Sequence, residues 1–221
     1  MHAIYLTTLL GAIVAAAPPL TGPAGFAQTA RFDDLTGTPG IVINQVGNSG
    51  FYQQVLWRGF ALVDTRVPGD LTSVTSSILS RPGVPPFSPP NSIAWGTKNF
   101  QTVLGGQAAI DTNYTTSNVE YMDLKNIRFG CSSSTVTSLT SVPANCDITL
   151  TCNRADGTKL SQTFNFRMAL TQTRAAQILA EPVGFTRCAN VVFENPVTPG
   201  VIAAGAILTG TADDVAYIYY V

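Results

Sequence analysis

Apolar and polar residues alternate along much of the chain in short runs, as they do in strands that have one buried face. The clearest run is "CDITLTC" (146–152), in which cysteines, isoleucine and leucine alternate with Asp and Thr. A second is "TFNFRM" (163–168), whose two Phe and one Met would face inward. The Asp156-Gly157 pair between these runs is typical of a tight turn. We therefore expect a β-hairpin in this part of the chain.

Similar short runs recur along the rest of the chain. They predict strands in 53–63, 91–95, 100–105, 119–131, 161–170, 188–194, 201–209 and 214–221. For 170–181 a short helix that ends before Pro182 and an irregular strand are both open. The proline-rich segment 66–92 predicts a long loop, serving as a binding rim or as a cover for an open sheet edge. The pattern predicts an all-β fold, an antiparallel β-sandwich of about twelve short strands.

Composition supports short strands joined by turns within one domain. The 221 residues include 19 Gly and 14 Pro, and only 11% of the side chains are charged. Gly and Pro favour turns, and a chain of this length can bury one sizeable core. The net charge of −1 gives no sign of a basic surface, so neither nucleic acid nor an anionic membrane is an expected partner.

The first 27 residues have the pattern of a signal peptide. Ala3–Ala17 is an apolar run of about fifteen residues, too short for an ordinary membrane span, and three prolines follow it. Small residues favour cleavage after Ala17 or after Ala27, and we prefer Ala27. This predicts a signal peptide (1–27), a single β-sandwich domain (28–221) without a membrane span, and an extracellular or cell-wall location. The alternative is an apolar first strand or a buried N-terminal helix.

Cleavage would remove His2, which is the only histidine. Catalytic Ser-His and Cys-His pairs and most zinc sites need an imidazole. We therefore predict no catalytic residues of these kinds, and these residues by themselves predict no cofactor. A glycosidase would depend on carboxylates alone, and Glu120, Glu181 and Glu194 are the only glutamates.

Secretion would place the four cysteines in an oxidising compartment, where an even number predicts disulfide bonds. Cys146 and Cys152 would share one strand face about 20 Å apart, so they cannot bond to each other. Two connectivities then remain open. We favour Cys131–Cys146 together with Cys152–Cys188, where the first pair closes a Ser/Thr-rich stretch (132–145).

Three aromatic residues are candidates for stacking on sugar rings: Trp57, Phe87 and Trp95. Phe87 belongs to the long loop and the two tryptophans belong to the strands that flank it. The alternative is that they fill the core, as aromatic residues in strands commonly do. Asn113 begins "NYT", an N-glycosylation signal that suits a surface loop of a secreted protein.

Several short stretches follow one another in a familiar order: "FDDL", "SPPNSIAWG", "MDLKNIRFGC", "VPANC" and "ADDVAY". This order resembles a widespread family of fungal secreted proteins without assigned function, over most of the predicted mature chain. More distantly, the Phe-Asp-Asp beginning and the Asp-Asp-Val end look like galactose-binding-type jelly rolls of carbohydrate-binding modules. This likeness implies that the β-sandwich is jelly-roll-like. The chain departs from the family's pattern in 44–57, "NQVGNSGFYQQVLW".

The resemblance implies a structural calcium site at the two ends of the domain. Its ligands would be Asp33, Asp34, Asp213 and Asp214, with Asn91 as a looser candidate. The two Asp pairs would lie on adjacent first and last strands, where neighbouring side chains face opposite sides of the sheet. At most one Asp of each pair could then face a common ion. The alternative is that these carboxylates are solvated and protect a sheet edge.

The sequence favours a secreted, non-catalytic binding protein, with a polysaccharide or cell-surface glycan as partner. The first alternative is a secreted effector or structural wall protein that binds another protein. The second is a carboxylate-based glycosidase. An exposed aromatic platform would favour glycan, a flat apolar patch would favour protein, and a cleft with paired carboxyl groups would favour the enzyme.

Overall fold

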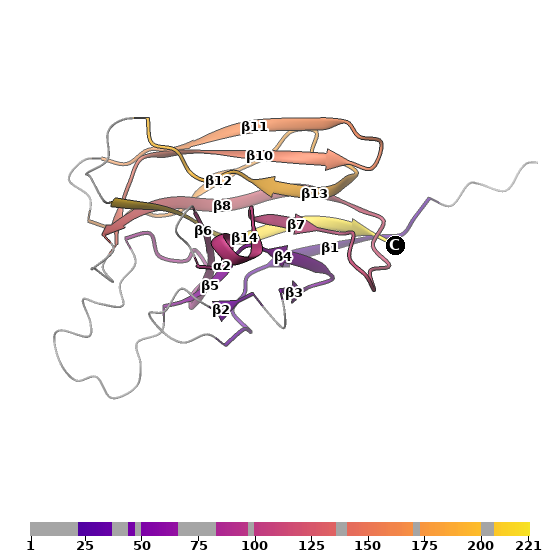
Figure 1. Ribbon diagram of the computed structural model, residues 1–221, viewed down its shortest axis with the longest axis horizontal. Coiled ribbons are helices and arrows are strands. Elements are labelled where there is room, and N and C mark those ends of the chain that lie inside the picture. Colours follow the sequence, from indigo (N-terminus) through magenta and orange to yellow (C-terminus); the bar gives the residue numbers. More distant parts are fainter. Residues whose placement is uncertain are drawn as a thin grey trace, which may run out of the picture.

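Strands account for almost all regular structure in the computed structural model of the chain (Figure 1). The structure describes residues 22–36, 44–46, 50–65, 83–96, 100–135, 141–169, 173–199 and 206–221. The strands are β1 (Gly25–Ala30), β2 (Asn44–Gln45), β3 (Phe51–Tyr52), β4 (Val55–Arg58), β5 (Ala61–Asp64), β6 (Asn91–Trp95), β7 (Ala109–Asp111), β8 (Tyr121–Thr135), β9 (Val142–Pro143), β10 (Cys146–Arg154), β11 (Lys159–Phe166), β12 (Ile178–Ala180), β13 (Cys188–Phe193) and β14 (Ala206–Tyr220). A short helix, α2 (Phe100–Gly105), accompanies them. The all-β prediction is confirmed.

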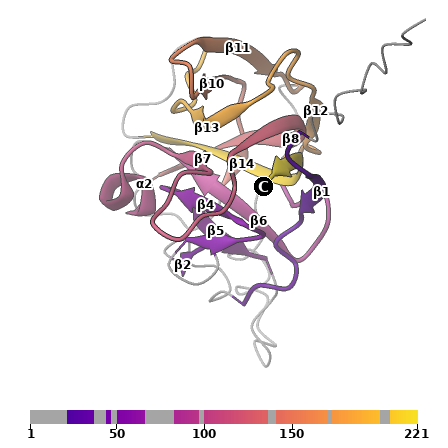
Figure 2. The same ribbon diagram turned by 90° about the vertical axis from the view of Figure 1, so that its right-hand side faces the viewer.

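The described strands pair antiparallel in one 14-stranded sheet. From β13 one branch continues through β7 and β4 to β3, and a second through β8, β14, β6 and β5 to β2. β10 also pairs with β13, and β11 pairs with β10. Figures 1 and 2 show that the sheet curls, so that β10 and β11 lie in one layer and β4 and β5 in another. The result is a sandwich-like arrangement around a shared core.

Aromatic side chains fill the core between the two branches. Trp57 of β4 meets Tyr217 of β14 with ring centroids 6.4 Å apart, and Trp95 of β6 meets Phe193 of β13 at 5.3 Å. The indole nitrogens are satisfied, since Trp57 Nε1 donates to Tyr52 O (3.1 Å) and Trp95 Nε1 to Glu194 O (2.9 Å). Edge-on packing of this kind adds to the stability from burial alone. The core therefore holds both branches of the curled sheet together.

The predicted hairpin is β10–β11. Alternate residues of β10 are buried, as the sequence pattern predicts, and Gly157 takes φ +83° in the turn that joins the two strands. The disulfides are Cys131–Cys146 and Cys152–Cys188, so the favoured connectivity is confirmed.

The prediction of a strand at 100–105 is wrong, because this segment forms α2. A short apolar run fits either a helix or a strand, and its tertiary contacts decide. Thr102 Oγ1 donates to Gly59 O (2.7 Å) and accepts from Gly96 N (3.2 Å). The helix then ends before Gly106, whose φ of +79° suits a helix C-terminus.

Other strand boundaries differ from the predicted runs. Gly59, with φ +71°, divides 53–63 into β4 and β5. The irregular strand that was one of two options for 170–181 is present as β12, which pairs with β8, although residues 170–172 lie outside the described part. The predicted strands at 201–209 and 214–221 are joined in one long strand, β14. Residues 201–205 lie outside the described part of the chain.

The first and last described strands lie side by side, as predicted. β1 pairs with β14 along its whole length. Asp213 and Asp214 lie within β14, but "FDDL" forms the turn after β1 and not part of that strand. The two Asp pairs therefore approach one another from a turn and a strand.

The pairing of β1 bears on where a signal peptide would be cut. β1 begins at Gly25, and cleavage after Ala27 would remove three of its six residues. Cleavage after Ala17 would leave the strand whole. The signal peptide itself remains a prediction, because residues 1–21 lie outside the described part.

We expect the cost of losing each disulfide to follow the length of the loop that it closes. The cysteines are separated by 15 residues in Cys131–Cys146 and by 36 in Cys152–Cys188. In the chain-entropy model this corresponds to about 3 and about 4 kcal/mol. Changing both cysteines of a pair to Ala and measuring the free energy of unfolding in urea tests the expectation. A non-reduced peptide map that joined Cys131 to Cys152 would contradict the connectivity.

Candidate functional site

Asp213 and Asp214 lie at a break in β14. The register of β14 against β8 shifts between Asp213 and Ala216, and Asp214 has φ +46°. Neighbouring residues of a regular strand face opposite sides of the sheet. The left-handed bend instead brings both carboxylates to Ser88. The expectation that the two side chains of this pair face opposite sides of the sheet is therefore wrong.

Ser88 is the centre of this acidic cluster. Its backbone N–H donates to Asp213 Oδ2 at 2.8 Å, and its Oγ lies 3.1 Å from the same oxygen and 2.9 Å from Asp214 Oδ1. The backbone N–H of Asp214 donates to Asp213 Oδ1 at 2.8 Å. Both oxygens of Asp213 are therefore occupied by protein groups, and its side chain is fully buried.

Burial changes the proton affinity of the cluster. Desolvation raises the pKa of Asp213 to about 7, and the charge of Asp214 adds to this effect, while the hydrogen bonds from Ser88 and the Asp214 N–H oppose it. Desolvation also raises the pKa of Asp33, and Asp214 contributes again. The Asn91 N–H, the Ser88 hydroxyl and Arg31 lower the pKa of Asp33. Asp33, Asp213 and Asp214 thus interact around one serine.

The remaining predicted ligands have structural partners. Asn91 is fully buried, and its Nδ2 donates to Phe32 O and Leu35 O, both at 2.8 Å. It thereby holds the acidic turn, residues 31–35, in which Phe32 has φ +64°. Asp34 lies apart from the cluster and accepts a hydrogen bond from Tyr52 Oη at 2.6 Å.

The structure does not identify these residues as metal ligands. Across the described ranges no group of three or more His, Cys, Asp or Glu side chains is arranged to hold a metal ion. The negative charge of Asp213 and Asp214 is met by backbone N–H groups, by Ser88 and by Arg31, whose Nε lies 3.6 Å from Asp214 Oδ1. Asp33 Oδ1 is buried without a hydrogen-bond partner among the described residues. Calcium therefore stays a prediction from resemblance that this geometry does not support.

The three residues predicted to stack on sugar rings differ in their exposure to solvent. Trp57 and Trp95 are 1% and 0% exposed, so neither can stack on a ligand, and their assignment as binding residues is wrong. Both belong to inward-facing positions of core strands. Phe87 is 51% exposed, but the Arg128 guanidinium lies over its ring, 3.6 Å from the centroid.

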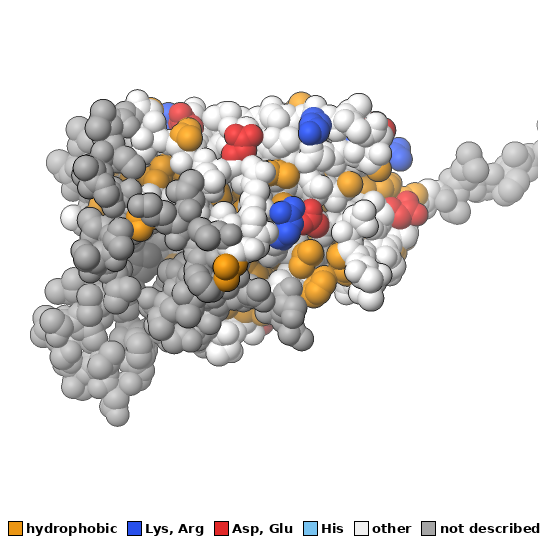
Figure 3. Space-filling view, viewed as in Figure 1, with side chains coloured by type: hydrophobic (Ala, Val, Ile, Leu, Met, Phe, Trp, Pro, Cys, Tyr) orange, Lys and Arg blue, Asp and Glu red, His pale blue; other side chains and the backbone are white. Residues whose placement is uncertain are grey.

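A pocket with a different aromatic pair lies at the β3–β4 hairpin. It has a volume of about 280 Å³ and is lined by residues 51–55 together with Tyr114 and Thr116. Phe51 is 44% exposed and its ring packs against that of Tyr114, with centroids 4.8 Å apart. Figure 3 shows hydrophobic side chains gathered over the region where Figure 1 has β3 and β4. We call this the hairpin pocket.

Hydrogen bonds define how Gln53 presents its amide in this pocket. Tyr52 has one hydroxyl proton, which it donates to Asp34. Burial and the Asp34 carboxylate raise the pKa of Tyr52, so it keeps this proton. The Gln53 atom 3.0 Å from Tyr52 Oη must then be the donor Nε2. Gln53 Oε1 is left buried, without a hydrogen-bond partner among the described residues.

The hairpin turn is strained. Gln53 and Gln54 have φ +49° and +68°, the left-handed values of a two-residue hairpin turn that Asn-Gly or Gly-Gly would normally occupy. Such strain is characteristic of ligand sites, where particular side chains are needed at an unfavourable backbone position. Tyr217 Oη helps to hold the turn by donating to Gln53 O at 2.7 Å.

The N-glycosylation signal lies next to the hairpin pocket. Asn113 is exposed and directly precedes Tyr114, whose ring contacts Phe51. The exposure agrees with the predicted surface loop, and occupancy by a glycan remains a prediction.

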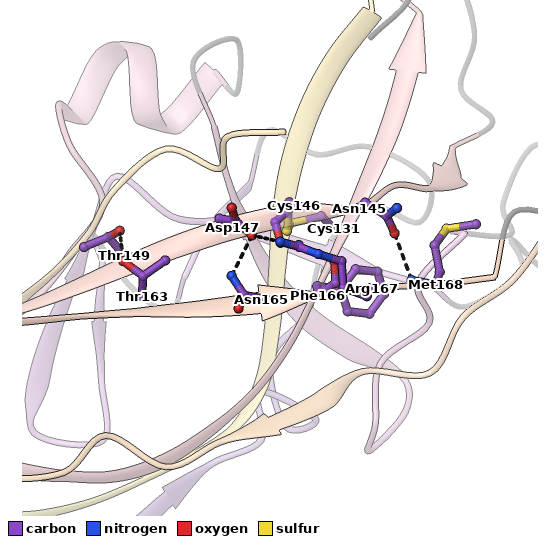
Figure 4. Close-up of polar contacts among 10 residues, drawn as sticks. All are labelled: Cys131, Asn145, Cys146, Asp147, Thr149, Thr163, Asn165, Phe166, Arg167 and Met168. Carbon is purple, nitrogen blue, oxygen red and sulfur yellow. Dashed lines mark hydrogen bonds and ion pairs between the residues drawn. A yellow bond between two sulfur atoms is a disulfide. The ribbon is translucent and has the colours of Figure 1, made fainter. Parts of the chain in front are cut away.

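A second polar network lies on the β10–β11 hairpin, shown in Figure 4. Arg167 forms an ion pair with Asp147 and donates to Cys146 O at 2.6 Å, and Asn165 Nδ2 donates to Asp147 at 2.8 Å. The hydrogen bonds from Arg167 and Asn165 hold the pKa of Asp147 below its usual value. The network joins the two strands beside Cys131–Cys146, so we interpret it as structural.

Among the described residues, no glutamate is placed in a buried site where it could act as the acid of a glycosidase. Glu120, Glu181 and Glu194 are all exposed. Asp213 has a raised pKa, as a general acid would, but it is fully buried with both oxygens engaged. A substrate could not reach it without opening the cluster.

Comparison with protein-family models, curated proteins and solved structures found no match to the chain. Within the described ranges no helix is both long and apolar enough to cross a membrane. The assignment of function therefore depends on the site geometry.

We expect Gln54→Gly to raise the free energy of unfolding by about 0.5–1 kcal/mol, because glycine adopts positive φ without the clash that strains glutamine. The matched control is Gln28→Gly in β1, which should lower stability by a similar amount, about 0.5–1 kcal/mol. Urea denaturation of both variants measures the difference. Equal destabilisation by the two changes would show that the turn is not strained.

Proposed function

We propose that the protein is an extracellular, non-catalytic carbohydrate-binding protein, and that it binds sugar in the hairpin pocket. The observation that carries this proposal is the exposed ring of Phe51 beside the exposed polar side chains of Gln54 and Thr116 in one pocket. Sugars present an apolar C–H face and a rim of hydroxyl groups. The pocket offers a surface for each.

The chemistry of the lining supports a neutral sugar. The ring of Phe51 can stack on the apolar face of a pyranose. The exposed Gln54 amide and Thr116 hydroxyl can each donate to and accept from the hydroxyl groups of a sugar. Among the described residues, the lining contains no Asp, Glu, Lys or Arg. A pocket of about 280 Å³ suits a chain end or a short oligosaccharide.

Other features support the extracellular setting. Two disulfides are typical of proteins from oxidising compartments. The apolar N-terminal run, the N-glycosylation signal at Asn113 and the resemblance to fungal secreted proteins point the same way. The likeness to carbohydrate-binding jelly rolls supports both the ligand class and a jelly-roll order of strands.

A protein partner has less support. A flat apolar patch would favour it, but the large hydrophobic side chains that are exposed lie on separate elements, among them Phe26 on β1, Leu104 on α2, Val142 on β9 and Leu179 on β12. Single exposed apolar residues are normal on protein surfaces.

We expect Phe51→Ala to reduce binding to neutral oligosaccharides by about fivefold or more, because loss of a stacking ring removes about 1–3 kcal/mol. A glycan array of the purified protein identifies the class, and titration with chitotriose, mannotriose and laminaritriose measures affinity. Phe26→Ala is the matched control, since Phe26 is 46% exposed and stacks on Tyr219 at 5.4 Å much as Phe51 packs on Tyr114.

The proposal is contradicted if the array shows no glycan binding, or if Phe26→Ala lowers affinity as much as Phe51→Ala. A binding protein partner that is lost with Phe51→Ala, without any glycan binding, would support the effector alternative. Urea denaturation of both variants checks that the fold is kept.

A further inference from the structure

The N-glycosylation signal overlaps the wall of the hairpin pocket. The signal consists of Asn113, Tyr114 and Thr115, whereas Tyr114 and Thr116 help to line the pocket. Signal and lining therefore share the short stretch 113–116. Asn113 and Thr115 are exposed, as the attachment of a bulky glycan requires. A sugar attached to Asn113 would start from the residue next to Tyr114, about 3.8 Å away along the backbone.

Contacts on both sides hold the backbone of Asn113 at the rim of the pocket. Before it, the N–H and Oγ1 of Thr112 both donate to Ala189 O, at 3.0 and 2.9 Å. After it, the ring of Tyr114 packs against that of Phe51, with centroids 4.8 Å apart. A glycan on Asn113 therefore has a fixed starting point beside the exposed ring of Phe51.

The sugars of an N-glycan have the chemistry that the pocket lining suits. The core of such a glycan consists of N-acetylglucosamine and mannose, which are uncharged and present apolar C–H faces and polar hydroxyl groups. The described lining offers the 44% exposed ring of Phe51 for the faces. It offers the exposed side chains of Gln54 and Thr116 for the hydroxyl groups. A sugar on Asn113 thus belongs to the ligand class that the pocket fits.

We propose that an N-glycan on Asn113 folds back into the hairpin pocket and occupies it as an intramolecular ligand, so that glycosylation weakens the binding of sugars from solution. The inference rests on the proposed function, because it takes a neutral sugar to be the ligand of the pocket. In the attachment step, Asn113 Nδ2 forms a bond to the anomeric carbon of a lipid-linked oligosaccharide. The lipid diphosphate leaves and takes up the proton that the amide nitrogen loses.

Tethering gives the attached sugar an advantage over a free one. A ligand on a short flexible tether has an effective concentration in the millimolar range. Its competition multiplies the apparent Kd of a free sugar by one plus the ratio of this concentration to the Kd of the attached sugar. With a Kd of about 1 mM, an effective concentration of about 5 mM weakens free-sugar binding about sixfold. Occupation also stabilises the folded state, because the unfolded chain has no pocket that binds the glycan.

The direct test uses the wild-type protein secreted from yeast. Mass spectrometry of its peptides should find a glycan on Asn113, and NMR should show nuclear Overhauser effects between sugar protons and the ring of Phe51. An unmodified Asn113 would overturn the proposal. A glycan whose protons contact only the residues adjacent to Asn113 in sequence would overturn it as well.

Affinity for free sugars gives a second test. Thr115→Ala removes the signal but keeps Asn113, and Thr115→Ser is the matched control because it keeps the signal. Each protein is titrated with chitotriose, mannotriose and laminaritriose. The sugar that binds best should bind Thr115→Ala several-fold more tightly than it binds the wild-type protein, while Thr115→Ser should match the wild type. Equal affinity of all three proteins would contradict the proposed regulation.

A glycan placed elsewhere separates occupation of the pocket from crowding by any glycan. Asp156→Asn turns residues 156–158 into an Asn-Gly-Thr signal at the exposed turn between β10 and β11. This turn lies in the layer opposite β4, away from the hairpin pocket (Figure 1). Combined with Thr115→Ala, the change moves the glycan, and affinity should stay as high as in Thr115→Ala alone. A fall to the wild-type affinity would overturn occupation of the pocket as the cause.

Stability gives a readout that needs no free sugar. The glycosylated wild-type protein should have a higher urea midpoint than Thr115→Ala. This difference should remain when both proteins also carry Phe26→Ala and should vanish when both carry Phe51→Ala. Phe26 is the matched control, because it is 46% exposed on β1 and is not part of the pocket lining. An equal difference in the two backgrounds would show that the glycan does not bind at Phe51.

Failure of the proposed function is distinguishable from failure of this inference. The pocket of Thr115→Ala carries no tethered sugar, so this variant shows whether free sugars bind at all. If it binds none of the three trisaccharides, the proposed function fails. The nuclear Overhauser effects between the glycan and Phe51 then still decide whether the glycan of Asn113 occupies the pocket.

Discussion

The fold depends on one long strand, β14, which pairs with three neighbouring strands. β14 pairs with β8 along one edge, and with β6 and then β1 on the other. A strand in this position lies within the curled sheet, and Tyr217 from it meets Trp57 across the core. The change of partner from β6 to β1 occurs where the register of β14 breaks, after Asp213. The break buries a carboxylate, and its surroundings are built to satisfy that group.

This buried carboxylate connects distant parts of the chain. Asp213 holds Ser88, and Ser88 in turn contacts the neighbouring Asp214. The acidic turn packs beside them and is held by Asn91, while its Asp34 accepts the proton of Tyr52. These contacts therefore connect the buried Asp213 within the sheet to the hairpin pocket at the surface. Phe32 and Asp214, which take part in these contacts, have positive φ. Gln53 and Gln54 in the pocket have positive φ as well.

The alternation of apolar and polar residues predicted those features of the fold that neighbouring residues determine. The alternation in 146–152 placed both cysteines on the buried face, and the distance between them excluded one disulfide pairing. The run 91–95 is β6 without change of boundary. Tertiary contacts decided the rest: hydrogen bonds of Thr102 favour a helix at 100–105, and the curl of the sheet buries both tryptophans.

The candidate site was predicted only in part. The clustering of Asp33 with Asp213 and Asp214 was expected from the repeated Asp pair, but Ser88 was not, because only the folded chain brings it to them. Gln53 and Gln54 carried a local signal, two polar residues between "FY" and "VLW", which is the spacing of a two-residue hairpin. The unfavourable φ that singles them out cannot be read from sequence.

The central claim is that the hairpin pocket binds carbohydrate, and the most direct measurement is amide chemical-shift mapping with the best-binding neutral trisaccharide. The account predicts saturable shifts concentrated in residues 51–55 and at Tyr114 and Thr116, with smaller shifts at Asp34 through Tyr52. Shifts centred instead on the shallow hollow of β1, β14 and β8, which Gln28, Lys125 and Ile218 help to line, would contradict it.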